Sequence, residues 1–186
     1  MVFGLALSLG AITLIGQPPQ NPGQLYAALG IFAFSFIILM TVWHSYTTIM
    51  GSITLETRGL LLLNLVLLFV VAIEPYLLAV VAFQPGPTTN LLAEPGSVLY
   101  AIDVAAMNAI LGAFMHILAR EEKPLLAPPQ ARKMRIRRDF TCGAAALFLL
   151  TTLPVFWTRT WLGLPSRVVL WILTLPLGWA VRTRTR

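Results

Sequence analysis

Eight polar or titratable residues interrupt long apolar runs in this sequence, and these residues could do chemistry. They are Ser8, Trp43, His44, Asn64, Glu74, Asp103, Asn108 and His116. Polar groups inside apolar helices are costly, so they usually face a partner, a cavity or a pathway. Imidazole and carboxylate groups can carry protons, whereas amides and hydroxyls can join helices through hydrogen bonds. The pattern favours either ion or proton movement or contacts between helices.

Metal binding and enzymatic catalysis have little support in the sequence. No carboxylate stands at ligand spacing from His44, and His116 is far away along the chain. There is no Gly-x-Ser-x-Gly or His-Glu-x-x-His motif, no carboxylate pair on one helical face and no glycine-rich phosphate loop. We therefore expect neither an enzyme nor a metal site.

The composition predicts the elements that position these residues. The chain has 186 residues, of which 58% are hydrophobic and only 11% charged, and its mean hydropathy is +0.81. A bilayer-spanning helix needs about 20 apolar residues, and several runs reach that length. Because a lipid environment also requires every backbone polar group to be paired internally, we expect an all-α integral membrane protein.

The apolar runs divide the chain into six expected transmembrane helices in one domain over residues 1–186. They cover residues 2–15, 25–50, 60–83, 98–119, 140–158 and 168–181, with a basic cytoplasmic loop over 120–139. The first run is short for a span, but it lacks the basic region and cleavage site of a signal peptide. Four tryptophans near the ends of the last two runs predict anchors at the membrane interface. They are Trp157, Trp161, Trp171 and Trp179.

Charge predicts the orientation of these helices. The formal net charge is +6, and most of the excess lies in the segment from Arg132 to Arg138 and in the tail. If both termini are cytoplasmic, 11 Lys and Arg residues lie inside and only Arg159 and Arg167 lie outside. This follows the positive-inside rule for a multi-pass protein of the cell membrane, in contact with lipid and not with nucleic acid.

The second and third helices form a hairpin whose polar residues lie at one depth. His44 is six residues before the end of the second helix and Asn64 about five residues into the third. Both are therefore about 8 Å from the cytoplasmic turn, and a hydrogen bond between them is plausible. We expect Trp43, His44 and Asn64 to form a polar clamp between the two helices. Glu74 precedes a proline near the outer end of the third helix. We expect its carboxylate to be solvated at the outer mouth of a possible ion path.

The first helix carries a narrow apolar stripe. Leu5, Leu9 and Ile12 follow the spacing i, i+4, i+7, with small residues around them. Small residues allow tight helix packing. Alternatively, the stripe lines a pore, where apolar rings gate ion flow by dewetting. Spacing alone leaves both interpretations open.

The hairpin resembles a known family. The stretch "WHSYTTIMGSITLETRGLLLLNLVLLFVVAIEP" is similar to the second and third helices of the lysosomal-type potassium channel family, transmembrane protein 175, in its prokaryotic single-repeat branch. The pattern has Trp43 and His44 on one helix and Asn64 before Pro75 on the next. Tyr100 and the alanine after it resemble the start of the family's fourth helix. The resemblance covers roughly residues 2–118.

The resemblance implies a potassium-permeable cation channel whose first helices line a pore in a homotetramer. Leu5, Leu9 and Ile12 would form the hydrophobic constriction, and Ser8 would supply a hydroxyl between them. Such a channel would need no cofactor and would bind only the K⁺ ions that pass through it. The family's signature, an Arg followed by Phe-Ser-Asp on the first helix, is absent, because the chain starts at "MVFGLALSL". Either the start is truncated or the chain is a divergent member.

Two other functions remain open at this stage. His44, Glu74 and Asp103 are titratable groups in apolar runs, so a proton-coupled transporter or a proton leak pathway is the alternative. In a third interpretation, the polar groups only hold helices together, in a membrane protein with a structural role.

Overall fold

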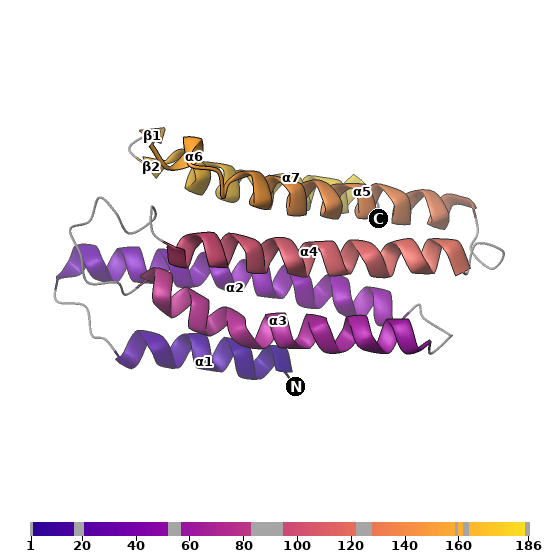
Figure 1. Cartoon of the computed structure of the whole chain (residues 1–186), viewed down its shortest axis with the longest axis horizontal. Helices are drawn as coiled ribbons and strands as arrows, with labels where there is room; N and C mark the ends of the chain where they lie inside the picture. Colours follow the sequence, from indigo (N-terminus) through magenta and orange to yellow (C-terminus); the bar gives the residue numbers. More distant parts are fainter. Residues whose placement is uncertain are drawn as a thin grey trace.

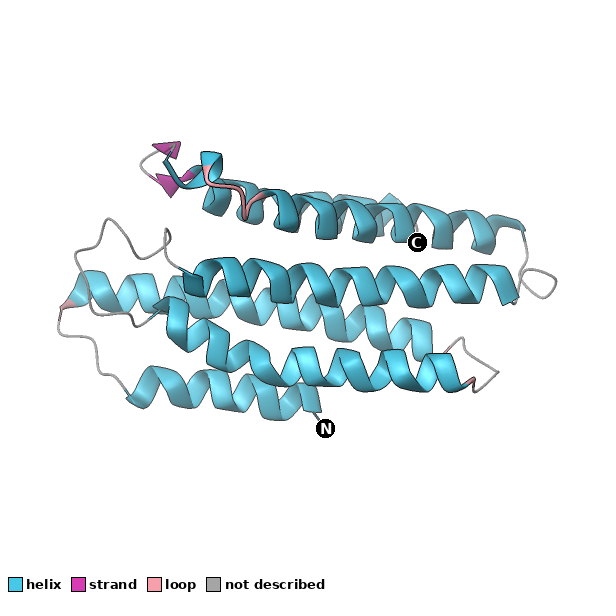
Figure 2. Cartoon of the chain, viewed as in Figure 1, coloured by secondary structure: helices cyan, strands magenta, loops and turns pink. Residues whose placement is uncertain are grey.

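Helices make up nearly all of the described structure. The structure, a computed structural model, describes residues 2–16, 21–51, 57–82, 95–121, 128–158, 160–161 and 164–184. Its elements are α1 (Val2–Gly16), α2 (Pro22–Met50), α3 (Arg58–Ala82), α4 (Pro95–Glu121), α5 (Pro128–Leu150), α6 (Val155–Thr158), β1 (Thr160–Trp161), β2 (Leu164–Pro165) and α7 (Ser166–Arg184). The strands pair antiparallel, Thr160 with Pro165 and Trp161 with Leu164, in a small turn before α7 (Figure 2).

Local sequence signals account for where α2 begins and why α3 bends. The side chain of Asn21 accepts a hydrogen bond of 2.8 Å from the backbone N–H of Gln24, and Pro22 occupies the first turn of α2. Both are favoured at helix starts, where backbone N–H groups lack partners. Pro75 lies inside α3 and has no N–H to donate. Figure 1 shows α3 changing direction in its C-terminal third, the part that contains this proline.

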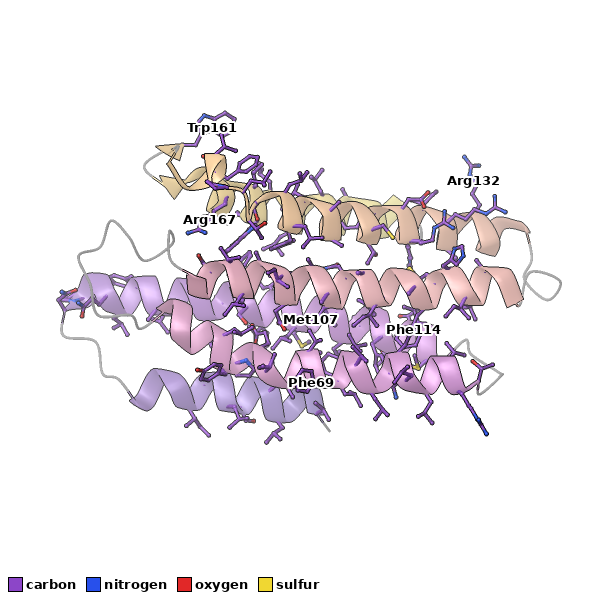
Figure 3. The ribbon with its side chains drawn as sticks, in the orientation of Figure 1. Phe69, Met107, Phe114, Arg132, Trp161 and Arg167 are labelled. Atoms are coloured by element: carbon purple, nitrogen blue, oxygen red, sulfur yellow. The ribbon has the colours of Figure 1, made fainter. Side chains whose placement is uncertain are left out.

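Helix α4 is the centre of the bundle. It packs against α2, α3 and α5, while α1 packs mainly against α3 and α7 against α5 (Figure 1). The core between α2, α3 and α4 is mostly apolar. Its most deeply buried side chains include Leu39, Leu67, Met107 and Phe114, of which Met107 and Phe114 are labelled in Figure 3.

The α2–α3 hairpin and the basic start of α5 lie at the same end of the bundle (Figure 1). The end of α2, the start of α3, the end of α4 and the start of α5 lie at one end of the bundle (Figure 1). Arg132 lies at that end, whereas Trp161 and Arg167 lie at the opposite end (Figure 3). Basic residues of the hairpin and of α5 therefore gather on the same side.

The expectation of a membrane-embedded helical protein is supported in part. Among the described residues, three helical segments are long and apolar enough to cross a bilayer: Pro22–Met50, Arg58–Leu77 and Gly96–Ala119. Helix α1 has only 15 residues, and the apolar part of α7, Ser166–Gly178, is shorter than a full span. The count of six spans and the cytoplasmic location of the termini stay predictions.

The expected basic loop over residues 120–139 is wrong in its extent. Helix α4 continues to Glu121 and α5 already begins at Pro128, so the basic segment is helical. Proline is well tolerated in the first turn of a helix, and the Arg and Lys residues that follow are good helix formers. Residues 122–127 lie outside the described part of the chain. The expected helix over 140–158 instead ends at Leu150, and the short α6 follows.

Candidate functional site

Helix α1 has one buried face and one exposed face. Phe3 and Ala6 are buried against the bundle, whereas Leu5, Leu9 and Ile12 are 61%, 41% and 58% exposed. The three exposed side chains are the stripe expected from their spacing. The stripe therefore lies on the outside of the single subunit, where it is accessible to lipid or to another copy.

Ser8 lies on the exposed side of α1 together with the stripe. Its hydroxyl donates a hydrogen bond of 2.9 Å to the carbonyl oxygen of Gly4, one turn earlier. The donor is thus satisfied within the helix, as is usual for serine in an apolar helix. The hydroxyl oxygen keeps acceptor capacity on the same face as Leu5 and Leu9.

The polar contact between α2 and α3 differs from the expected one. The side-chain oxygen of Asn64 accepts a hydrogen bond of 2.9 Å from the hydroxyl of Tyr46, not from His44. Counting residues gave the right depth, but a helix turns about 100° per residue, so side chains two positions apart point to opposite sides. Trp43 and His44 are exposed on α2. The expected clamp of Trp43, His44 and Asn64 is wrong within one subunit, and Tyr46 takes the place of His44.

The Tyr46–Asn64 pair also contacts the first helix through Tyr46. The ring of Phe3 lies 5.7 Å from the ring of Tyr46, centroid to centroid. The start of α1 therefore packs on a tyrosine whose position is fixed by a hydrogen bond to α3. Tyr46 is the residue of this contact that the sequence reasoning missed.

We expect Tyr46→Phe to destabilise the protein modestly. The variant keeps the ring that packs on Phe3 but leaves the Asn64 amide without its donor, which costs about 1 kcal/mol. The free energy of unfolding, measured by SDS titration in mixed micelles, checks this. Tyr76→Phe is the matched control, because Tyr76 is exposed on α3, and it should leave that free energy unchanged. Equal effects of the two variants would contradict the role given to Tyr46.

Glu74 is buried, so the expectation of a solvated outer-mouth acid is wrong. Its side chain is only 1% exposed, and its carboxylate accepts a hydrogen bond from the hydroxyl of Ser35 on α2. The bend of α3 next to Pro75 lies in the same part of the helix. A buried carboxylate needs such a donor, because burying it unpaired is expensive.

Asp103 and Tyr100 add to this polar region of the core. Both are buried and lie three positions apart on α4, on one helical face. Among the described residues, one carboxylate oxygen of Asp103 and the Tyr100 hydroxyl have no hydrogen-bond partner. His44 does not join this region, because it is nine residues, or about 14 Å, further along α2 than Ser35. The structure thus brings Glu74 near α4 but does not assemble the three titratable groups of the proton-pathway alternative.

The two remaining polar candidates make local contacts. The amide of Asn108 donates a hydrogen bond of 2.8 Å to the carbonyl oxygen of Val104 within α4. A ring nitrogen of His116 lies 3.5 Å from the guanidinium of Arg138 on α5. Asn108 therefore does not bridge to another helix through this bond, whereas His116 contacts the basic half of α5.

Sequence reasoning also missed a cluster around Trp171, which it placed at the membrane interface. Trp171 is 4% exposed, and its ring packs on those of Phe34, Tyr100 and Phe148 at 5.6 to 6.4 Å. Its indole N–H donates a 2.8 Å hydrogen bond to Thr151. An aromatic residue at a helix end gives no signal of such burial, because interfacial anchors and core residues share that composition.

Arg167 lies beside this cluster at the start of α7. Its guanidinium lies 6.0 Å from the centre of the Trp171 ring, a geometry in which a cation is attracted to the ring face. Burial lowers the pKa of Arg167 to about 10, so the side chain keeps its positive charge at neutral pH. This residue was expected only as an outer-side charge.

Comparison with known proteins connects these helices to a family of channels. Residues 2–75 match the family model described as endosomal/lysosomal potassium channel TMEM175. The match covers α1, α2 and α3 as far as Pro75, which includes the exposed stripe and the Tyr46–Asn64 contact. The resemblance noted for the hairpin is thereby confirmed.

A curated relative extends the similarity beyond the first three helices. The chain is 26% identical over 148 residues to a potassium channel of Streptomyces collinus, and the alignment covers 73% of this chain and 70% of the relative. No solved structure gives a significant match.

Proposed function

We propose that this chain, a member of the endosomal/lysosomal potassium channel TMEM175 family, forms a potassium-permeable cation channel. The family match over residues 2–75 and the similarity to a Streptomyces potassium channel support this function. The family match includes α1, the helix that we propose to line the pore. No catalytic role is assigned to any residue.

The observation that carries the proposal is the exposed stripe on α1. Leu5, Leu9 and Ile12 lie on one face with Ser8, while the opposite face of the same helix is packed on the bundle. One subunit has a single α1, and one helix cannot surround an ion path. We therefore propose a homotetramer in which four copies of α1 meet around an axis, with the stripes facing each other.

The side chains of the stripe suggest how such a pore controls ion flow. Rings of Leu and Ile make a narrow apolar neck, which ions cross only when it widens or becomes wet. Ser8 would supply four hydroxyl oxygens between the rings of Leu5 and Leu9. In the tetramer, Trp43 and His44 are exposed side chains on a neighbouring helix, and we propose that they contact an adjacent copy.

The proposed location is the cell membrane, with six spans and both termini in the cytoplasm. The excess of Lys and Arg on one side of the expected topology supports this orientation. The arrangement of the helices is consistent with it, because the basic start of α5 and the α2–α3 hairpin lie at one end of the bundle (Figures 1 and 3). The proposed channel requires permeant K⁺ but no cofactor.

Potassium flux through liposomes tests the proposal. We expect the purified chain to give a K⁺ flux that empty liposomes lack, and to migrate as a tetramer in native mass spectrometry. Leu5→Ala and Ile12→Ala should each change the flux several-fold and lower the preference for K⁺ over Na⁺, because shorter side chains widen the apolar neck.

Leu62→Ala is the matched control for these substitutions. Leu62 is as exposed as Leu5 and Ile12 but lies on α3, so we expect its truncation to leave flux and selectivity unchanged. Absence of K⁺ flux in the wild type would refute the channel. Wild-type flux that Leu5→Ala and Ile12→Ala leave unaltered would refute only the pore assignment of α1.

A further inference from the structure

The basic half of α5 is held at a defined depth beside α4. Two contacts fix the register of this antiparallel pair: Arg138 lies 3.5 Å from His116, and a β-carbon on Gly112 would lie 2.8 Å from the sulfur of Cys142. In both contacts the residue numbers add to the same value, so the same register runs along the pair. By this register, Arg135 lies opposite Ala119.

Ala119 is the last residue of the segment of α4 that is long and apolar enough to cross a membrane. Arg135 therefore lies at the end of the apolar layer, and Arg132 lies three residues, or about 4.5 Å, beyond it. When this segment of α4 spans a bilayer, Arg132 and Arg135 lie at the depth of the lipid headgroups. The following residues of α5, from Phe140 to Leu150, run beside the apolar part of α4.

One face of this basic half is exposed. Arg132, Arg135, Ile136 and Asp139 are all exposed, and they lie within about 100° of one another around the helix. Asp139 is engaged by Arg138, whose guanidinium donates to its carboxylate at 2.7 and 2.9 Å. Among the residues that the structure describes, no carboxylate pairs with Arg132 or Arg135.

The chemistry of this face fits an anionic phospholipid. Guanidinium groups bind phosphate oxygens in a two-pronged geometry, and they do so where the phosphates of a leaflet lie. Ile136, the residue after Arg135, is 42% exposed on the same face. An exposed isoleucine among arginines at this depth can enter the boundary between headgroups and acyl chains, as in helices that lie at a membrane surface.

We propose that the α5 basic face, formed by Arg132, Arg135 and Ile136, binds the headgroup of an anionic glycerophospholipid. The two arginines hold the phosphate and Ile136 contacts the upper acyl chain. The site lies on α5, away from the α1 stripe, so it is a separate property from ion conduction.

Native mass spectrometry of the detergent-purified chain, titrated with phosphatidylglycerol or phosphatidylcholine, tests the site. We expect the wild type to bind phosphatidylglycerol more tightly than phosphatidylcholine. Each surface arginine contributes about fivefold to the affinity for an anionic lipid, so the double variant Arg132→Gln, Arg135→Gln should bind about 25-fold more weakly. The readout is lipid binding, so it is independent of whether the protein conducts K⁺.

Two further variants sharpen the test. Arg58→Gln removes an exposed arginine at the same end of the bundle but on α3, and it should leave phosphatidylglycerol binding unchanged. Arg132→Lys with Arg135→Lys keeps both charges but removes the two-pronged geometry, so its affinity should lie between those of the wild type and the double glutamine variant. Because both arginines are exposed, we expect the wild-type unfolding temperature in each variant.

Two results would overturn the proposal. One is equal binding of phosphatidylglycerol by the wild type and the double glutamine variant. The other is an equal loss of phosphatidylglycerol affinity in Arg58→Gln. That result would show that all basic residues at this end of the bundle attract the lipid and that the α5 basic face is not a specific site.

Discussion

Trp171→Ala should lower the free energy of unfolding by about 3–5 kcal/mol, the largest effect that we expect from any single truncation in this chain. The ring joins four helices, since it lies on α7 and packs on Phe34 of α2, Tyr100 of α4 and Phe148 of α5. Its truncation opens a cavity and leaves the hydroxyl of Thr151 without the indole donor. SDS titration in mixed micelles measures the loss.

Trp161→Ala provides the matched control. Trp161 is 65% exposed at the tip of the short strand pair, and its truncation should change the free energy of unfolding by less than about 0.5 kcal/mol. If both tryptophan variants lost the same small amount, the docking of α7 through Trp171 would be contradicted. Trp171→Phe keeps most of the ring packing and should lose less than Trp171→Ala.

Phe114→Ala should lower the free energy of unfolding by about 3 kcal/mol. Phe114 is fully buried on α4 in the core shared with α2 and α3. Between helices in a bilayer, lipid tails are as apolar as the side chains, so close packing carries much of the association. A cavity at this position removes van der Waals contacts that lipid cannot replace.

Phe69→Ala is the control for this second variant. Phe69 lies on α3 and is 66% exposed (Figure 3), so in a membrane it faces lipid or another copy. In monomeric protein in detergent we expect almost no change in stability. A loss as large as that of Phe114→Ala, measured under the same conditions, would show that the core does not lie where the structure places it.

The apolar runs determined much of the helical layout. Helices α2, α3 and α4 begin and end within about four residues of their predicted bounds, because about 20 apolar residues in a row leave a helix as the favourable state in lipid. The stripe on α1 was also visible, since its spacing of i, i+4, i+7 is a property of the helix alone. That the stripe is exposed could be learned only from the tertiary structure, because it depends on which face of α1 packs on the other helices.

The basic segment shows where hydropathy fails. Its charges predicted a loop, but the residues from Pro128 onward are good helix formers and continue into the apolar half of α5. Hydropathy reports whether a segment prefers lipid or water. A single helix that passes from water into lipid can have one polar half and one apolar half, so a change in hydropathy does not mark a helix end. The register against α4, which sets the depth of Arg135, depends on the close approach of Cys142 to Gly112.

The sequence by itself determined the class of protein, the main helices and the depth of its polar residues, since these depend on composition and on the rise of 1.5 Å per residue. Only the tertiary structure decided which side chains meet. It paired Asn64 with Tyr46, buried Glu74 beside Ser35 and buried Trp171 among four helices. The physical reason is that contacts depend on the rotation of each helix about its axis, which is set by packing with neighbours distant in sequence.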